Sequence, residues 1–114
     1  MDKVDMRPAD LLIEAFSGDT IRLNVTTEDD YSEYEWQGSI KSDKKKNTPV
    51  DAIFSFSPSR EVGHHWQTEA FVNGTDELVE DNVYEGVWDI KVVGDNVTLT
   101  LLQGIVRIHP SVTR

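Results

Sequence analysis

Alternating apolar and polar residues between positions 84 and 110 are the feature that most restricts the fold. Side chains two apart on a β-strand share a face. Trp88, Ile90 and Val92 therefore form one apolar face, while Asp89 and Lys91 point the other way. This pattern predicts a strand that is buried on one side only.

A hairpin and a second strand are expected next. Residues 94–96, Gly-Asp-Asn, tolerate the positive φ of tight turns. The apolar pattern resumes at Leu99, breaks at residues 103–104, which we interpret as a bend or bulge, and ends before Pro110. Such a meander cannot stand alone, so earlier strands must supply a second layer.

The earlier part of the chain contains further strand patterns. They cover residues 11–16 (a strand in preference to a helical turn), 20–26, 34–41, 50–57 and 66–72. Thr75 is predicted to cap one helical turn, and the mid-strand Gly38 to mark a bulge or a close backbone approach. Seven to nine short strands, with turns about every 8–12 residues, predict an all-β, antiparallel sandwich or barrel.

The predicted core consists of the apolar residues that face inward in these strands. They are Ile21, Leu23, Val25, Trp36, Ile40, Phe54, Phe56, Trp88, Ile90, Val92, Leu99, Leu101, Val106 and Ile108.

Length and composition fit one small domain. The 114 residues are enough for a core, and we expect a flexible arm over residues 1–9 followed by a single domain over 10–114. The chain has no cysteine, so disulfides and thiolate chemistry are excluded. We find no apolar stretch with the length of a signal peptide core or a membrane helix.

The net charge of −10 restricts the partners. Phosphates would be repelled, so nucleic acid and anionic membranes are not expected as ligands. The same charge suits a soluble protein or one that binds a basic partner.

No motif predicts catalysis. His64 and His65 are adjacent and would point to opposite faces of a strand, while His109 stands alone, so a metal site is not expected. The acidic clusters lack the spacing of a calcium loop, and nucleophile elbows, phosphate loops and dinucleotide fingerprints are missing. The sequence predicts a protein that is not an enzyme and binds no cofactor.

Aromatic residues and acids leave two alternative functions open. Trp36 and Trp88 belong to the predicted core, but Trp66 and Tyr31 could be exposed and stack on sugars, as in a carbohydrate-binding module. The acidic surface could instead mimic nucleic acid and inhibit a protein with a basic groove. The acids fall mainly in turns, however, and three lysines interrupt them.

An ordered set of short motifs suggests a family. They are Gly18-Asp19-Thr20, Trp36-Gln37-Gly38-Ser39-Ile40, Tyr84 followed by Trp88-Asp89-Ile90, Leu102-Gln103-Gly104-Ile105-Val106 and Val112-Thr113-Arg114. In this order they resemble small structural proteins encoded among the virion genes of tailed bacteriophages. The set is also similar to the immunoglobulin-like N-terminal domain of lactococcal phage baseplate upper proteins. Residues 28–30 and 43–46 depart from the pattern.

The resemblance implies an immunoglobulin-like β-sandwich that serves as a virion part in the baseplate, tail, neck or capsid decoration. Such a protein would assemble in the bacterial host cytoplasm with other virion proteins and with copies of itself. We expect residues 50–57 to form an edge strand whose exposed Ile53 contacts a neighbour. The other candidate interface residues are Lys44, Lys45 and Lys46 in a polar loop, and Thr113 and Arg114 at the end of the chain.

Overall fold

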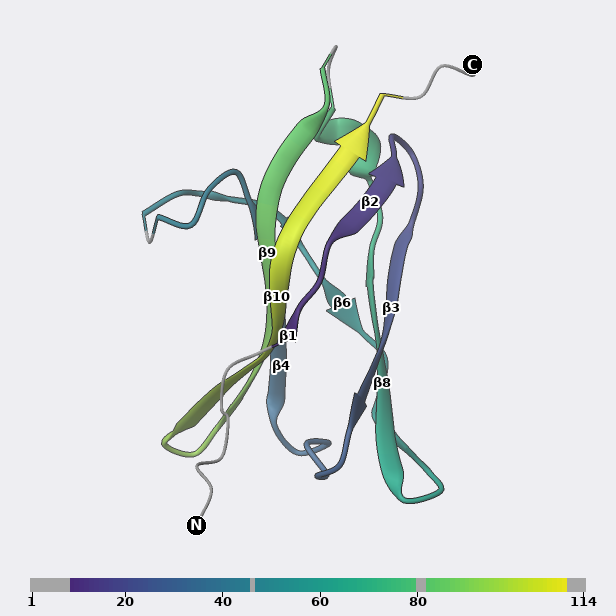
Figure 1. Ribbon diagram of the computed structural model, residues 1–114. Helices are drawn as coiled ribbons and strands as arrows, with labels where there is room; N and C mark the ends of the chain where they lie inside the picture. Colours follow the sequence, from purple (N-terminus) through teal and green to yellow (C-terminus); the bar gives the residue numbers. More distant parts are fainter. Residues whose placement is uncertain (1–8, 46, 80–81, 111–114) are drawn as a thin grey trace.

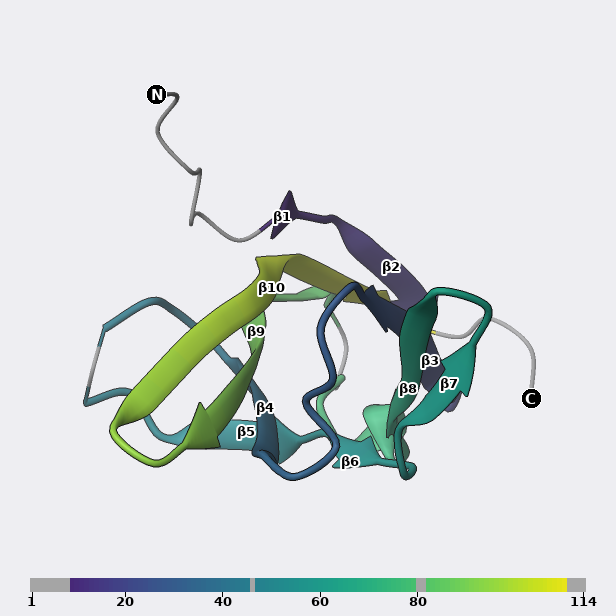
Figure 2. The ribbon, with the colours of Figure 1, turned by 90° about the horizontal axis from the view of Figure 1, so that it is seen from below.

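The computed structural model describes residues 9–45, 47–79 and 82–110, and it consists of two β-sheets packed face to face (Figures 1 and 2). The larger sheet contains, from edge to edge, β1 (Ala9–Asp10), β10 (Val97–His109), β9 (Tyr84–Gly94), β4 (Glu35–Lys41) and β5 (Val50–Ile53), and β2 (Ile13–Phe16) also pairs with β10. The smaller sheet contains β3 (Ile21–Thr27), β8 (His65–Val72) and β6 (Ser55–Phe56), with β7 (Arg60–Val62) beside β8. A short 3-10 turn, η1 (Thr75–Glu77), joins β8 to β9.

The strand order is that of an immunoglobulin domain. One sheet contains β3, β8 and β6, and the other contains β10, β9, β4 and β5. The variable type of immunoglobulin domain likewise has an additional strand in the second sheet, and β5, next to β4, takes that place. The predicted all-β, immunoglobulin-like sandwich is therefore confirmed.

The first strands differ from the prediction in direction. β1 and β2 run parallel to β10, so the sandwich is not wholly antiparallel. Both β2 and β10 run toward the turn that leads into β3, where the Ser17 N–H donates to the His109 carbonyl over 2.8 Å. Ala9, which was assigned to the flexible arm, belongs to β1 and pairs with Leu102. Residues 1–8 lie outside the described part of the chain.

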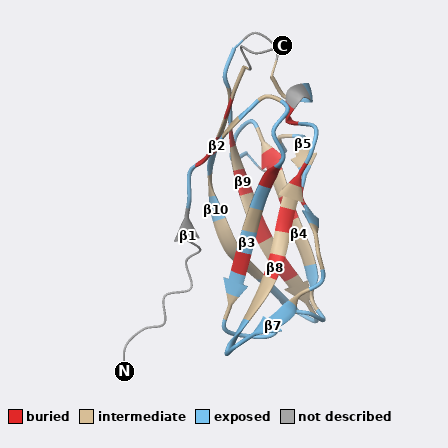
Figure 3. Ribbon diagram, turned by 90° about the vertical axis from the view of Figure 1, so that its right-hand side faces the viewer, coloured by how far each residue is buried: buried red, intermediate tan, exposed pale blue. Residues whose placement is uncertain are grey.

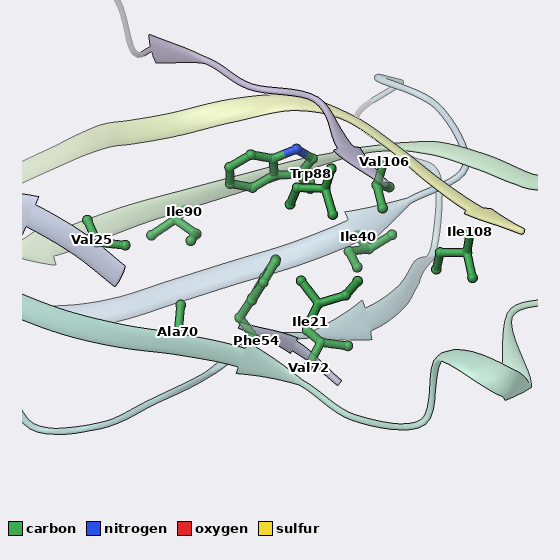
Figure 4. Close-up of a cluster of buried hydrophobic side chains, with 11 residues drawn as sticks. Ile21, Val25, Ile40, Phe54, Ala70, Val72, Trp88, Ile90, Val106 and Ile108 are labelled. Carbon is green, nitrogen blue, oxygen red and sulfur yellow. The ribbon is translucent and has the colours of Figure 1, made fainter. Parts of the chain in front are cut away.

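Most of the predicted core is buried between the sheets (Figures 3 and 4). Nine of the predicted side chains are buried: Ile21, Val25, Ile40, Phe54, Trp88, Ile90, Val92, Val106 and Ile108. Four are partly buried and pack against that core: Leu23, Trp36, Phe56 and Leu101. The prediction omitted Ile13, Thr68, Ala70 and Val72, all of which are buried.

Leu99 is the exception, because it is only half-buried and is not packed against the central cluster. It pairs with Val92 near the tip of the β9–β10 hairpin, which leans away from the smaller sheet in Figure 1. Val92 is buried but, like Leu99, lies outside the central cluster.

The irregularity of β10 lies earlier than predicted. The pairing with β9 shifts between Thr100 and Leu102, so the bulge is at Leu101, and β10 continues unbroken through Gly104. One extra residue on a bulged strand moves the inward positions from odd to even numbers. This explains why Leu99 and Val106 both face inward.

Gly104 has a different role, which is to let another segment approach. A Cβ built on Gly104 would lie 1.8 Å from the carbonyl oxygen of Leu11. The same Leu11 carbonyl accepts a 3.1 Å hydrogen bond from Nε1 of Trp88, the residue paired with Gly104. The missing side chain therefore allows the segment between β1 and β2 to lie against the strand pair β9–β10.

The predicted strand 50–57 divides between the two sheets. β5 pairs with β4 at the outer edge of the larger sheet, as expected for an edge strand, whereas β6 pairs with β8. The change of sheet occurs at Phe54, whose N–H donates to the Gly38 carbonyl over 2.9 Å and whose ring approaches the space above Gly38. Gly38 therefore marks a close approach, one of the two alternatives predicted for it.

Thr75 does not cap a helix, contrary to the prediction. The N-cap of η1 is Gly74, which has a φ of 74° and no side chain to bond with. Thr75 is completely buried; its hydroxyl accepts from the Gly18 N–H and donates to the Asp19 carbonyl. The side chain thus joins η1 to the turn between β2 and β3.

Candidate functional site

The outer face of the larger sheet, the face turned away from β3 and β8, is the candidate site. The register places two rows of side chains on it: Ile53, Ser39, Asp89 and Gln103 in one, and Lys41, Val87 and Ile105 in the next. Alternation directs these residues outward because their neighbours Trp88 and Ile40 are buried.

A groove of about 510 Å³, which we call the outer groove, opens on this face. Its apolar lining includes Leu11 and Leu12, from the segment between β1 and β2, and Val87 and Ile105, from β9 and β10. Its charged lining includes Lys41, Asp43, Lys44 and Asp89. The volume and the mixture of apolar surface with a few charged groups are typical of binding sites.

Exposed apolar side chains gather around this groove. The exposed fractions are 46% for Leu11, 53% for Leu12 and 44% for Ile105, while Ile53 on the same face is 71% exposed. Single exposed apolar residues are ordinary, but a cluster on one face indicates a surface for a protein partner.

The loop between β4 and β5 forms the cationic side of the groove. Oδ1 of Asp43 accepts hydrogen bonds from the Lys45 N–H, over 2.8 Å, and from the Thr48 hydroxyl, and the Thr48 N–H donates to the Lys45 carbonyl. These bonds hold the pKa of the Asp43 carboxyl below its usual value. The hydrogen bonds of Asp43 and Thr48 give this polar loop a defined shape. Lys44 and Lys45 are exposed on it.

β5 is fixed at its place on the edge by Tyr84. The Tyr84 hydroxyl donates to Oδ2 of Asp51 over 2.6 Å. Partial burial, followed by this contact with the carboxylate, raises the pKa of Tyr84 above its usual value. The contact anchors the strand that carries Ile53 onto the start of β9.

The predicted interface residues come together only in part. Lys44 lines the outer groove, Ile53 lies on the same face, and Lys45 is exposed in the same loop. Lys46, Thr113 and Arg114 lie outside the described residues. Sequence reasoning missed Leu11, Leu12 and Ile105.

Ile105 could have been found from the sequence, since it lies between two inward positions of a strand. Leu11 and Leu12 lie beside Ile105 because the chain approaches closely at Gly104. The residues around Leu11 and Leu12 in the sequence do not predict that contact.

The described residues contain no group of three or more His, Asp or Glu side chains placed to hold a metal ion. His64 is exposed in the turn between β7 and β8, and His65 is exposed at the start of β8, while Nε2 of His109 lies 2.9 Å from a carboxylate oxygen of Glu14. No helix within the described ranges has the length and apolar character needed to cross a membrane.

The aromatic residues that were considered for sugar binding do not form a flat platform. Trp66 and Tyr31 are both half-buried, and the ring of Tyr31 meets that of Tyr34 at 88°. Trp36 packs against Phe56 and donates its Nε1 hydrogen to the Tyr31 carbonyl.

Comparisons with known proteins add no relationship. The sequence matches no protein-family model and has no significant match among curated proteins.

Proposed function

We propose that this chain is a structural component of a tailed-phage virion that works by binding other proteins through the outer face of its larger sheet. The observation that carries the proposal is the outer groove, in which exposed Leu11, Leu12 and Ile105 face a cationic loop on an otherwise acidic molecule. The ordered motifs that resemble phage virion proteins support the virion as its location, after assembly in the host cytoplasm.

The groove favours a protein partner over other ligands. Its apolar wall would be desolvated by a protein segment, and its lysines would orient acidic groups of that segment. The function requires no cofactor and no catalysis, and it involves neither nucleic acid nor a membrane.

The two alternatives have less support. A nucleic-acid mimic needs unpaired acids in a regular row, but Glu69 is paired with Arg22 and Glu85 with Arg107 on the outer faces of the two sheets. A carbohydrate-binding module needs an accessible flat aromatic surface, and the perpendicular rings of Tyr31 and Tyr34 do not provide one.

Mass spectrometry of purified particles of the phage that encodes this sequence tests the location. We expect the chain as a stoichiometric component that copurifies with the particle after detergent and salt washes. Its absence from particles, while it accumulates free in infected cells, would overturn the proposal.

A matched pair of variants tests whether the chain binds its partners through the outer face of the larger sheet. Ile105→Asp in the groove should abolish incorporation, whereas Val62→Asp on the smaller sheet should not. Both side chains are 44% exposed, so the two changes perturb folding similarly. Equal incorporation of both variants would contradict binding through the outer groove.

A further inference from the structure

The two ends of β4 carry opposite charges. The turn before it, which we call the acidic turn (residues 28–34), contains Glu28, Asp29, Asp30 and Glu33, and Glu35 is the first residue of β4. The other end begins the lysine loop, with Lys41, Lys44 and Lys45. Figure 1 shows the acidic turn at the bottom of the molecule and the lysine loop well above it on the left.

The acidic turn has a fixed shape. Oδ1 of Asp30 accepts from the Ser32 N–H over 2.8 Å, the Thr27 hydroxyl donates to the Asp29 carbonyl, and the Tyr34 N–H donates to the Tyr31 carbonyl. The turn is also anchored to the core, because Nε1 of Trp36 donates to the same Tyr31 carbonyl over 3.0 Å.

Tyr31 is a partly exposed aromatic residue within this acidic turn. The Tyr31 ring stands perpendicular to that of Tyr34, whose ring lies over Gly94 at the end of β9. The result is a preorganised turn in which acids surround a partly exposed aromatic ring, and such a turn would lose little conformational entropy on binding.

The outer groove offers an apolar wall for the Tyr31 ring and two lysines for the acids of the turn. It is concave, with an apolar wall made by Leu11, Leu12 and Ile105 and with lysines at positions 41 and 44 on the opposite side. Asp43 and Asp89 also line it, so the lysines define where an incoming acid can sit.

A chain cannot make this contact with itself. The acidic turn precedes β4 and the lysine loop follows it, and seven extended residues span about 23 Å. Contact between these two surfaces would therefore join two different molecules.

We propose that the acidic turn of one copy binds in the outer groove of the next copy, with Tyr31 against the apolar wall and Asp29 and Asp30 facing Lys41 and Lys44. This inference rests on the proposed function and names the partner of the same face as a second copy. Because the two surfaces differ, the contact is head-to-tail, and repetition gives a ring or a filament. Either is an arrangement from which the tail or neck of a particle can be built.

Mixing two blocked variants tests the geometry. Ile105→Glu blocks the groove, and Asp29→Lys with Asp30→Lys blocks the acidic turn. In sedimentation experiments the wild type should form concentration-dependent multimers, whereas each variant alone should associate at least about tenfold more weakly. An equimolar mixture should give dimers and nothing larger, since each variant keeps one working surface, and this result also proves that both variants are folded.

Exchanging the charges is a second test. Lys41→Asp and Lys44→Asp, combined in one chain with Asp29→Lys and Asp30→Lys, should restore multimers. Raising the salt concentration should weaken wild-type association, because charge pairs are screened beyond roughly 8 Å at physiological ionic strength. Association that strengthens with salt would indicate contact through the apolar edge strand β5 and would overturn the inference.

The inference and the proposed function fail separately. A wild type that stays monomeric at all concentrations, or a mixture without dimers, overturns head-to-tail binding. The chain would remain a virion component if it is still found in particles and if Ile105→Asp still prevents its incorporation.

Discussion

Trp88 shows how a single residue connects the two sheets with the first strands. Its side chain is only 2% exposed, its ring centre lies 6.1 Å from that of Phe54, and its Nε1 donates to the Leu11 carbonyl. We expect Trp88→Ala to lower the free energy of unfolding by about 3–5 kcal/mol through lost burial and a cavity. Denaturant unfolding measures this loss, and an unchanged midpoint would show that Trp88 is not a core residue.

Gly104 has the opposite requirement, because it must have no side chain. In Gly104→Ala the new Cβ would meet the backbone of Leu11, which cannot move without displacing β1 and β2. We expect a loss of at least about 1–3 kcal/mol in unfolding free energy, typical of overpacked sites.

Thr98→Ala provides the control for Gly104→Ala, since Thr98 is exposed in the same strand. Hydrogen exchange should also show faster opening of residues 13–16 in Gly104→Ala only. Equal stability of the two variants would contradict the close approach.

At the scale of elements, the edge strand β5 should respond to alkaline pH through Tyr84. The folded state raises the pKa of Tyr84 above the usual value of about 10, because partial burial and the Asp51 carboxylate both disfavour the phenolate. The stabilisation by the protonated phenol is therefore fully present below pH 10 and is lost as the pH rises above it.

Comparison with Tyr84→Phe isolates this effect from other groups that titrate at high pH. The wild type should lose stability more steeply than Tyr84→Phe between pH 10 and 12, as measured by denaturant unfolding. Parallel curves for the two proteins would rule out a role for the Tyr84 hydroxyl.

The loop between β4 and β5 should depend on one carboxylate. Asp43→Ala removes the acceptor for the Lys45 N–H and the Thr48 hydroxyl, so the loop should open and trypsin should cleave more rapidly after Lys44 and Lys45. Asp95→Ala, in the exposed β9–β10 turn, is the control. The same cleavage rate in both variants would show that Asp43 does not hold the loop.

The elements that could be predicted from sequence are those with local signals. The alternation of apolar and polar residues predicted the inward residues of β3, β4 and β9, because each of these strands has one solvent-exposed face. The bulge at Leu101 was displaced in the prediction because the glycine at 104 suggested a break, whereas that glycine accommodates Leu11. The division between β5 and β6 depends on which sheet offers a partner at Phe54, and local sequence does not encode that choice.

For the whole molecule, the exposed lysines and Ile53 were predicted, but the groove that they adjoin was not. Its apolar wall combines Leu11 and Leu12 with Ile105, residues more than ninety positions apart in the sequence. The parallel pairing of β1 and β2 with β10 brings these three residues together. The alternation of apolar and polar residues within one segment does not predict this pairing. The opposite charges at the ends of β4, in contrast, can be read from the sequence once the direction of that strand is known.

The parallel pairing of β2 with β10 also determines how the domain would bear mechanical load. The chain enters this strand pair at one end through β2 and leaves it at the other end through β10, so pulling on the two ends slides the strands along each other. The hydrogen bonds between the two strands then lie across the pull, share the force and break together, whereas an antiparallel hairpin pulled open at its ends would lose one bond at a time. We expect single-molecule stretching to show one high-force rupture, which Gly104→Ala should weaken. A module with such a clamp could hold under tension between its neighbours in a chain of copies.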